Sequence, residues 1–235
     1  LLEHCERILE DYKRLEYEMH LLHNEYTGGL KLGASTTIAQ YVLPPLLASF
    51  IGKFPQVNLS LLNGNSREIE AALQEHRIDL GFVEGVFRLP NIKYTTFLED
   101  ELVAVVRTGS RLTVGEEITP EELLHLPLVL RERGSGTLDV FERALQQHNI
   151  KLSSLQVLMY LGSTESIKLF LEHTDCLGIV SIRSITRELY SGQLRVVEIK
   201  GMPMLRDFSF AQPQGQESGL AQVFMQFAMH NNNKL

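Results

Sequence analysis

The sequence has few cysteines and no long apolar run. Its 235 residues include only two cysteines, Cys5 and Cys176, which lie far apart in the chain. This number excludes a disulfide framework and is typical of a reducing compartment, so we expect two free, buried thiols. No apolar run approaches the roughly 18 residues that a membrane helix needs, and no basic-then-apolar leader is visible in these residues. A membrane or secreted protein therefore has no support in the sequence, and we expect a cytoplasmic one.

The chain also has fewer basic than acidic residues. The chain has 22 lysines and arginines against 29 aspartates and glutamates, which gives a net charge of −7. Binding to nucleic acid needs a basic face that displaces counterions from the phosphates, and the sequence has no basic cluster. We therefore expect that these residues do not bind nucleic acid by themselves. Their hydrophobic content of 44% is enough for one or two domains with ordinary cores.

The first feature that is present is a charged helix over residues 1–26. Seven acidic and three basic residues surround a narrow seam, in which apolar residues recur every three and four positions. Such a seam predicts a linker or dimerisation helix that pairs with a second copy. The seam residues are Leu1, Cys5, Ile8, Tyr12, Leu15, Met19, Leu22 and Tyr26. The alternative is a helix packed on its own domain, with Leu2 and Leu9 widening the apolar stripe.

After a Thr-Gly-Gly break at residues 27–29, strands and helices alternate, which predicts an α/β fold. Helical crossovers between strands give parallel pairing. Pro44 and Pro45 lie within the first of these helices and should bend or restart it, because a proline ring removes a donor and crowds the preceding turn. We expect strands at 30–34, 57–62, 80–83, 94–107, 128–130, 157–161, 178–180, 194–199 and 208–211, and helices at 38–53, 66–75, 137–147, 164–172, 183–190 and 220–229.

Two interruptions, near residues 107 and 204, divide this pattern into two lobes. If the last strand and helix return to the first unit, residues 27–107 and 206–235 form one subdomain and residues 108–205 form the other. Two crossing strands would then join them. A cleft between such lobes, at the carboxyl ends of the strands, is where an α/β protein holds a small ligand.

Three short polar runs each lie between a predicted strand and the start of a predicted helix. They are residues 35–37, 134–137 and 162–164, and Asn65-Ser66 is a weaker fourth. The first N–H groups of a helix lack an internal partner and carry positive partial charge, so a hydroxyl or a bound anion completes them. Plain N-capping explains any one run. Three runs at the same end of successive strands favour a shared anion site, with Arg131 as the positive partner.

Glu84, at the end of the third predicted strand, has several possible roles. It could repel an anion, pair with Arg131, or accept a hydrogen bond from an amine on an amino-acid-like ligand. The plain alternative is a solvated loop carboxylate. The candidate ligand-binding residues are Ser35, Thr36, Thr37, Asn65, Ser66, Glu84, Arg131, Gly134, Ser135, Gly136, Thr137, Ser163 and Thr164.

Several segments, in their order and spacing, resemble the regulatory half of a LysR-type transcriptional regulator. Besides the seam helix they are Gly29–Ser35, Tyr41–Leu47, Phe54-Pro55, Asp79–Phe82 and Leu98–Val103, so the resemblance covers essentially the whole chain. It implies a linker helix followed by a two-lobed effector domain of the type 2 periplasmic-binding-protein-like fold. Such a domain binds a small effector and performs no catalysis.

The resemblance also implies parts beyond this chain. A winged helix-turn-helix domain would precede Leu1 and provide the contact with DNA, and we expect an upstream segment also because the helical pattern is already in progress at Leu1. The seam helix would form a homodimer, and effector domains would contribute to homotetramers. Val83-Glu84-Gly85 and Arg131–Thr137 look like the branch that regulates sulfur assimilation and carbon fixation, which responds to small, often anionic metabolites. A small anionic effector is therefore the expected partner.

The motifs of enzymes and metal sites fail in detail. Arg133 stands two residues before Ser135, which breaks a Gly-x-Ser-x-Gly elbow, and neither phosphate-loop nor dinucleotide fingerprint occurs. His20 and His23 lie one helical turn apart with Glu16 nearby, but no further ligand joins them. We therefore expect no enzyme, no cofactor and no metal. The alternatives are a solute-binding receptor of the same fold serving transport, and an enzyme on that fold, for which no nucleophile or cofactor lysine is evident.

Overall fold

The computed structural model describes residues 26–86, 88–112, 115–215 and 219–231. The predicted dimerisation helix lies outside these residues, apart from Tyr26, whose ring packs edge-on against Phe54 at a centroid distance of 5.5 Å. Among the described helices, none is long and apolar enough to cross a membrane.

The first half of the structure begins with three parallel strands. Strand β1 (Gly28–Ser35) pairs in parallel with β2 (Val57–Gly64) on one side and β3 (Leu80–Glu84) on the other. Helices α2 (Thr36–Tyr41) and α3 (Leu43–Lys53) connect β1 to β2, and α4 (Ser66–Gln74) connects β2 to β3. The predicted βαβαβ unit is therefore confirmed.

The prolines act as the sequence predicts. The helix stops at Tyr41 and restarts at Leu43, so that Pro44 and Pro45 fall in the first turn of α3. At these positions a helix has no internal partner for the backbone N–H, and the missing donor costs nothing.

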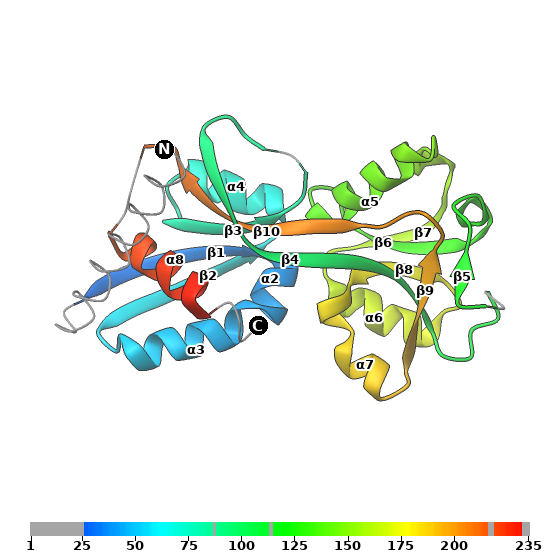
Figure 1. Cartoon of the computed structure of the whole chain (residues 1–235), viewed down its shortest axis with the longest axis horizontal. Helices are drawn as coiled ribbons and strands as arrows, with labels where there is room; N and C mark the ends of the chain where they lie inside the picture. Colours follow the sequence, from blue (N-terminus) through cyan, green and yellow to red (C-terminus); the bar gives the residue numbers. More distant parts are fainter. Residues whose placement is uncertain (1–25, 87, 113–114, 216–218, 232–235) are drawn as a thin grey trace, which may run out of the picture.

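Two strands run from the first half into the second. Strand β4 (Ile92–Arg107) spans 16 residues, and β10 (Leu205–Pro213) pairs with it antiparallel, from Ile92↔Pro213 to Glu101↔Leu205. Figure 1 shows both strands passing along the middle of the molecule between two groups of helices. Beyond residue 101, β4 pairs instead with strands of the second half.

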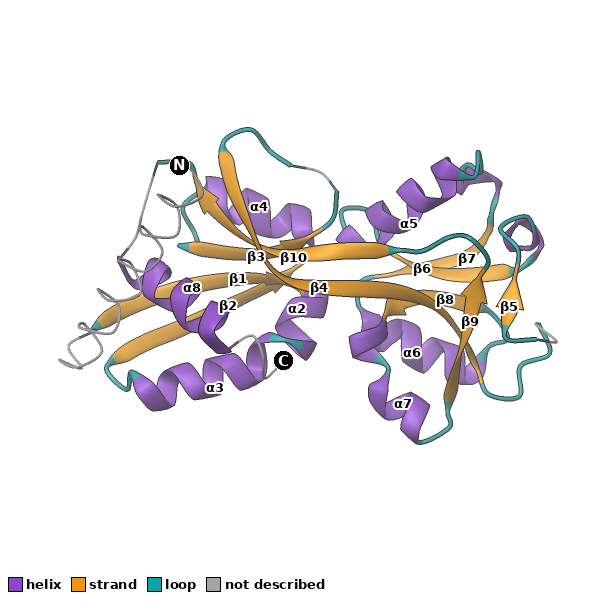
Figure 2. Ribbon diagram, viewed as in Figure 1, coloured by secondary structure: helices purple, strands orange, loops and turns teal. Residues whose placement is uncertain are grey.

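The second half repeats the strand–helix alternation. Its elements are β5 (Glu117–Ile118), β6 (Pro127–Arg131), α5 (Gly136–Gln147), β7 (Gln156–Leu161), α6 (Thr164–His173), β8 (Leu177–Ser181), α7 (Thr186–Tyr190) and β9 (Leu194–Ile199), with 3-10 turns at Glu122–His125, Leu152–Ser154 and Ile182–Ser184. The main sheet runs in the order β2-β1-β3-β10-β4-β8-β6-β7, and helices lie on both of its faces (Figure 2). Helix α8 (Gly219–Asn231) returns to the first half.

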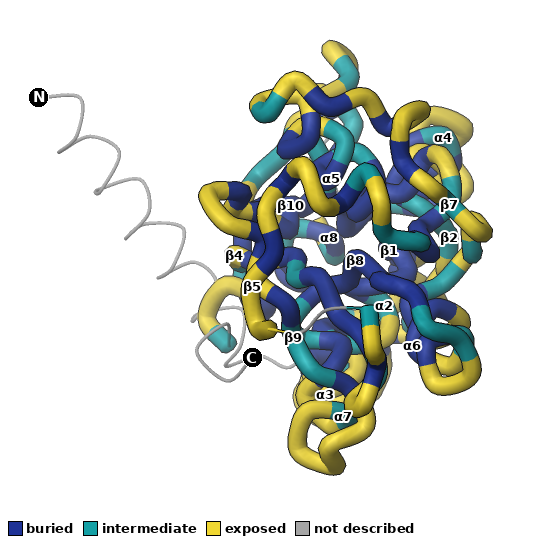
Figure 3. Tube along the Cα trace, turned by 90° about the vertical axis from the view of Figure 1, so that its right-hand side faces the viewer, coloured by how far each residue is buried: buried dark blue, intermediate teal, exposed yellow. Residues whose placement is uncertain are grey.

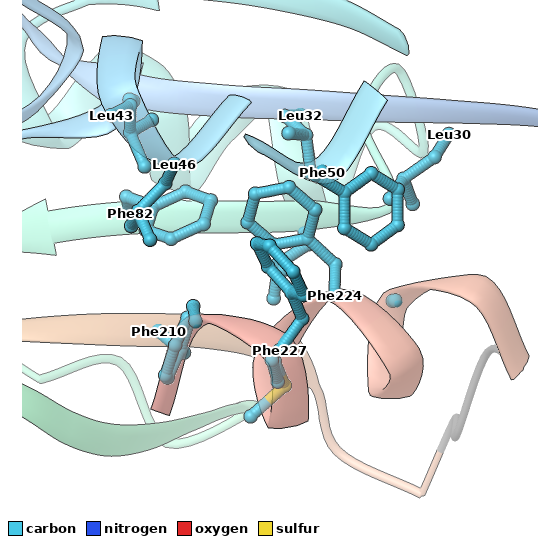
Figure 4. Packing of buried hydrophobic residues seen from close by; sticks show 14 of the residues in the cluster. Leu30, Leu32, Leu43, Leu46, Phe50, Phe82, Phe210, Phe224 and Phe227 are labelled. Atoms are coloured by element: carbon cyan, nitrogen blue, oxygen red, sulfur yellow. The ribbon is translucent and has the colours of Figure 1, made fainter. Parts of the chain in front are cut away.

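Each half has its own apolar core. In the first, Phe50 of α3 packs against Phe224 and Phe227 of α8, with ring centroids 4.8 and 5.2 Å apart (Figure 4). In the second, Phe141 of α5 is fully buried among strand side chains that include Leu128 and Leu130. Figure 3 shows this buried interior surrounded by exposed loops and helix surfaces. The cores agree in outline with two lobes, and the exact residue boundaries of the lobes stay a prediction.

Three short elements were not predicted from the sequence. The strand Glu117–Ile118 and the turns at Glu122–His125 and Leu152–Ser154 span 2, 4 and 3 residues, which is too short for a helix or strand pattern to repeat in the sequence. Strand β10 also begins at Leu205, three residues before the prediction, because polar residues precede its phenylalanines.

Candidate functional site

The polar runs lie where strands end and helices begin. Ser35 is the last residue of β1 and accepts from the N–H of Ile38, while Ser135 precedes α5 and accepts from the N–H of Thr137 at 3.2 Å. Ser163 caps α6 in the same way, and Asn65 forms a reciprocal capping box with Glu68 on α4. N-capping is therefore confirmed for these side chains. It accounts for their local role and leaves open which of them meet in space.

The structure brings Glu84, the last residue of β3, together with Ser35, Ser66 and the run that opens α5. The Ser35 hydroxyl donates to the Glu84 carboxylate, and the Ser66 hydroxyl donates to the Glu84 carbonyl oxygen at 2.8 Å. Gly136, at the first turn of α5, packs so closely that a Cβ built on it would overlap the Glu84 carbonyl oxygen. Since α5 belongs to the second half, Glu84 lies at the junction of the halves.

Two residues of this junction were missed by the sequence analysis, Arg206 of β10 and Asp100 of β4. The Arg206 Nε donates to Asp100 Oδ2 at 2.7 Å, and its Nη1 donates to the Thr137 hydroxyl at 3.0 Å. Nη2 also lies 2.7 Å from Asp100 Oδ2, but outside hydrogen-bond geometry. The same guanidinium lies 3.6 Å from Glu84 Oε1. Arg206 therefore connects the two halves through side chains of β3, β4 and α5.

The alternation of buried and exposed residues along β4 and β10 could have identified Asp100 and Arg206 from the sequence. Asp100 has the same strand parity as the buried Leu102 and Ala104, and Arg206 has the parity of the buried Phe208 and Phe210. A charged residue on the inward face of a strand needs a buried partner. The alternation therefore marks both positions as charged residues that need a buried partner.

The structure rules out two of the roles considered for Glu84. Its guanidinium neighbour is Arg206, so a Glu84–Arg131 pair is not formed. With 4% exposure it is a buried strand residue, and the alternative of a solvated loop carboxylate is wrong. Glu84 is buried because β3 continues one residue further than predicted and the start of α5 covers the end of this strand.

Arg131 forms a second polar group at the end of β6. Its guanidinium pairs with Glu132 at 2.8 Å, and it donates to the Thr164 hydroxyl and the Gly162 carbonyl oxygen, each at 3.4 Å. Arg131 therefore meets the run at 162–164, as the strand order predicts, because β6 and β7 are parallel neighbours.

Most of the candidate residues are buried. Ser35 and Thr37 are fully buried, Thr36 is 6% exposed and donates to the Gly64 carbonyl oxygen, and only Asn65 and Ser163 are half-buried. The Thr37 hydroxyl is buried without a hydrogen-bond partner. An unpaired buried hydroxyl costs free energy, so a bound group that accepts from it would be stabilised.

Cavities open at the junction of the halves within the described residues. One of about 350 Å³ is lined by Ser66, Arg67, Glu70, Glu84 and, from the second half, Asp139, together with Ala71, Gln74, Gly85 and Leu89. Burial raises the pKa of Glu70 and also that of Asp139 above the ordinary carboxyl range. Another, of about 400 Å³, lies against the crossing strands β4 and β10 and is lined in part by Arg88, Arg143 and Arg206. Within the described residues, no group of three or more His, Cys, Asp or Glu side chains is arranged to hold a metal ion.

Two α/β halves, two connecting strands and a polar junction built from helix starts define a two-lobed ligand-binding domain. A family model for the LysR substrate binding domain matches residues 23–232, and the chain belongs to that family. The family and fold predicted from sequence are thus confirmed.

The relatives of the chain include transcriptional regulators. It is 35% identical over 182 residues to the uncharacterized HTH-type transcriptional regulator YeiE of Escherichia coli strain K12. These aligned residues make up 77% of this chain and 61% of YeiE. It is 29% identical over 224 residues to the RuBisCO operon transcriptional regulator of Acidithiobacillus ferrooxidans, covering 95% of this chain and 71% of that protein. These proteins are transcriptional regulators, not enzymes, which confirms the expectation of a domain without catalytic activity.

A solved structure shows the same architecture. The CcmR regulatory domain of Synechocystis PCC6803, solved in complex with 2-PG, superposes with a TM-score of 0.79 at 27% identity, covering 89% of this chain and 99% of that domain. The family match favours a regulator over a solute-binding receptor.

Proposed function

We propose that this chain is the effector-sensing domain of a LysR-type transcriptional regulator and that it binds a small anionic metabolite between its two halves. The observation that supports this most is the junction itself. Polar side chains at the carboxyl ends of β1, β3 and β6 meet helix starts from both halves, so a ligand there would contact both. A ligand that binds two arrangements of the halves unequally shifts the population between them.

An anion suits the chemistry of this junction. Helices α2, α5 and α6 all begin there, and their first N–H groups favour negative charge. Arg131 supplies a buried guanidinium, and the free Thr37 hydroxyl supplies a donor. The binding of 2-PG by the related CcmR regulatory domain agrees with a small-molecule effector. The proposed binding residues are the full candidate set, with Arg206 added as the group that pairs with Glu84.

The rest of the regulator follows from the family. The chain spans only 61% of YeiE, so DNA binding through a winged helix-turn-helix domain is a property we propose for the whole protein. Residues 1–26 would form the dimerisation helix, with homotetramers built partly through effector domains. We further propose two subdomains, residues 27–107 with 206–235 and residues 108–205, and a cytoplasmic location.

Effector binding is tested by thermal unfolding of the chain with a panel of sulfite, sulfate, phosphate, O-acetylserine and phosphorylated sugars. A ligand at about 100 times its dissociation constant stabilises the folded state by roughly 2.7 kcal/mol. Arg131→Ala should abolish the shift, whereas Arg133→Ala, at an exposed neighbouring position, should preserve it. An equal shift in both variants would remove Arg131 from the site.

A further inference from the structure

Tyr41 connects the two halves at a point away from the crossing strands. It is the last residue of α2, and its phenol donates a hydrogen bond to Oε1 of Glu165, the second residue of α6. Figure 1 shows α2 and α6 as neighbours on the same side of the sheet, one from each half. Burial and the Glu165 carboxylate raise the pKa of Tyr41 above its ordinary value, so the phenol remains a donor.

The acceptor for this hydrogen bond is held in place by the second half alone. Lys168, one turn along α6, is buried, and its Nζ lies 2.8 Å from Glu165 Oε1, 2.8 Å from Glu188 Oε1 and 2.9 Å from the Ser184 carbonyl oxygen. Partial burial alone would raise the pKa of Glu165, but the bonds from Lys168 and Tyr41 lower it. The Lys168 Nζ also lies 5.4 Å from the centre of the Tyr41 ring. Tyr41 is therefore the part of this cluster that the first half contributes.

The Tyr41–Glu165 contact lies beside the proposed effector site. Tyr41 follows Thr37 by one helical turn on α2, and Glu165 follows Thr164 directly on α6. Thr37 is fully buried and Thr164 is 1% exposed. Because side chains this deeply buried are not reached from solvent, a ligand can reach these two hydroxyls only if α2 and α6 separate.

The two sides of the junction are held differently. On the α4/α5 side the Arg67 N–H donates to the Gly134 carbonyl oxygen at 3.3 Å, and Gly136 packs directly on the Glu84 backbone. Separation there would break contacts of the main chain. On the α2/α6 side the Tyr41–Glu165 contact joins two side chains, which can part by a change of rotamer. The contact between α2 and α6 can therefore break without the loss of a main-chain hydrogen bond.

We propose that Tyr41 and Glu165 form a latch that holds α2 against α6 and keeps the effector site closed, so that effector exchange requires the latch to open. Tyr41 is a positioning residue in this view, because it acts by fixing the separation of two helix starts. The part of the inference that concerns effector exchange rests on the proposed function; the part that concerns the separation of the halves does not.

The separation is measured by pulsed electron paramagnetic resonance on the 235-residue chain. Spin labels are placed at the exposed Ser49 of α3 and His173 of α6, in a Cys5→Ser background diluted with unlabelled chain. Tyr41→Phe removes only the phenolic donor, and we expect a longer and broader distance distribution. Glu165→Ala, which breaks the latch from the other side, should give the same change.

The matched control is Tyr94→Phe. The Tyr94 phenol donates to Glu70 Oε1 at 2.6 Å, which is the same pair of groups placed within the first half. This variant should leave the distance distribution unchanged. Distributions for Tyr41→Phe and Glu165→Ala that match the parent would overturn the latch, and so would an equal change in Tyr94→Phe.

Exchange is then measured with radiolabelled sulfate as the probe. Because the Glu165 side chain is 48% exposed, losing this hydrogen bond should accelerate sulfate release about two- to tenfold in Tyr41→Phe and not in Tyr94→Phe. Release at the parent rate, despite a longer distance, would overturn the gating role. If the parent chain binds none of the panel anions, the proposed anionic effector is wrong, while the distance measurement still decides the latch.

Discussion

Arg206 and Asp100 lie directly opposite each other on β10 and β4 and form a buried ion pair, with Nε 2.7 Å from Oδ2. The pair sits on the two strands that connect the halves. Ser181, at the end of β8, donates to the other carboxylate oxygen at 2.7 Å. The connection between the halves is therefore held by side chains from three strands.

Arg206→Met should be strongly destabilising. It leaves the buried Glu84 without the guanidinium of Arg206, and the buried Asp100 with the more distant guanidinium of Arg183, whose Nε lies 3.7 Å from Oδ1. Breaking a buried pair in this way costs about 3–5 kcal/mol. Urea unfolding of parent and variant measures the difference. Lys200→Met is the control, since Lys200 pairs with Glu117 at 3.6 Å with both side chains largely exposed, and an exposed pair is worth under about 1 kcal/mol. Equal losses in the two variants would contradict a special role for Arg206.

Gly136→Ala should disturb the junction of the halves. The added methyl group would overlap the carbonyl oxygen of Glu84, so α5 must move away from β3. Overpacking of this kind costs about 1–3 kcal/mol. Gly162→Ala is the matched control, because nothing lies within 4 Å of its added Cβ. Thermal unfolding should show a lower midpoint for the first variant alone, and an unchanged midpoint for Gly136→Ala would show that the junction adapts freely.

The features that the sequence predicted correctly depend on residues close together in the chain. Strand and helix periods, the proline restart at Leu43 and the capping serines all depend on neighbours within one or two turns. The same reasoning placed the polar runs at one end of the strands, because parallel strands end at the same edge.

What the sequence analysis missed depends on contacts between distant residues. The Arg206–Asp100 pair joins positions 106 residues apart, and Tyr41 meets Glu165 across 124 residues. The choice between Arg131 and Arg206 as the partner of Glu84 likewise depends on how β10 returns beside β3. The alternation along β4 and β10 marks Asp100 and Arg206 as inward-facing charges, but only the topology assigns their partners.

Cys176 should react slowly with thiol reagents in the folded chain. It is fully buried, and burial raises the pKa of its thiol to about 11, so little thiolate exists at pH 8. In a Cys5→Ser variant, we expect alkylation by iodoacetamide to be slow in buffer and to become fast in denaturing urea. Rapid alkylation without denaturant would mean that Cys176 is exposed by local opening.

Glu70→Gln should stabilise the chain at neutral pH. Burial raises the pKa of Glu70 above 4.5, while the hydrogen bond from Tyr94 opposes the shift only in part. The folded state thus binds the proton more tightly than the unfolded state, and the charged carboxylate at pH 7 reduces stability. This loss diminishes as the pH falls through the folded-state pKa and is gone below the unfolded value near 4.5.

Glutamine retains an oxygen that accepts from Tyr94 and carries no charge. The urea midpoint of Glu70→Gln should therefore exceed that of the parent at pH 7, and the two should converge toward pH 4.5. Glu75→Gln is the control, because its side chain is 60% exposed and should leave the midpoint unchanged at both pH values. A Glu70→Gln variant that is less stable than the parent at pH 7 would mean that the Glu70 charge is held favourably by Arg88 and Arg67, and that the 350 Å³ cavity beside it is an environment that stabilises anions.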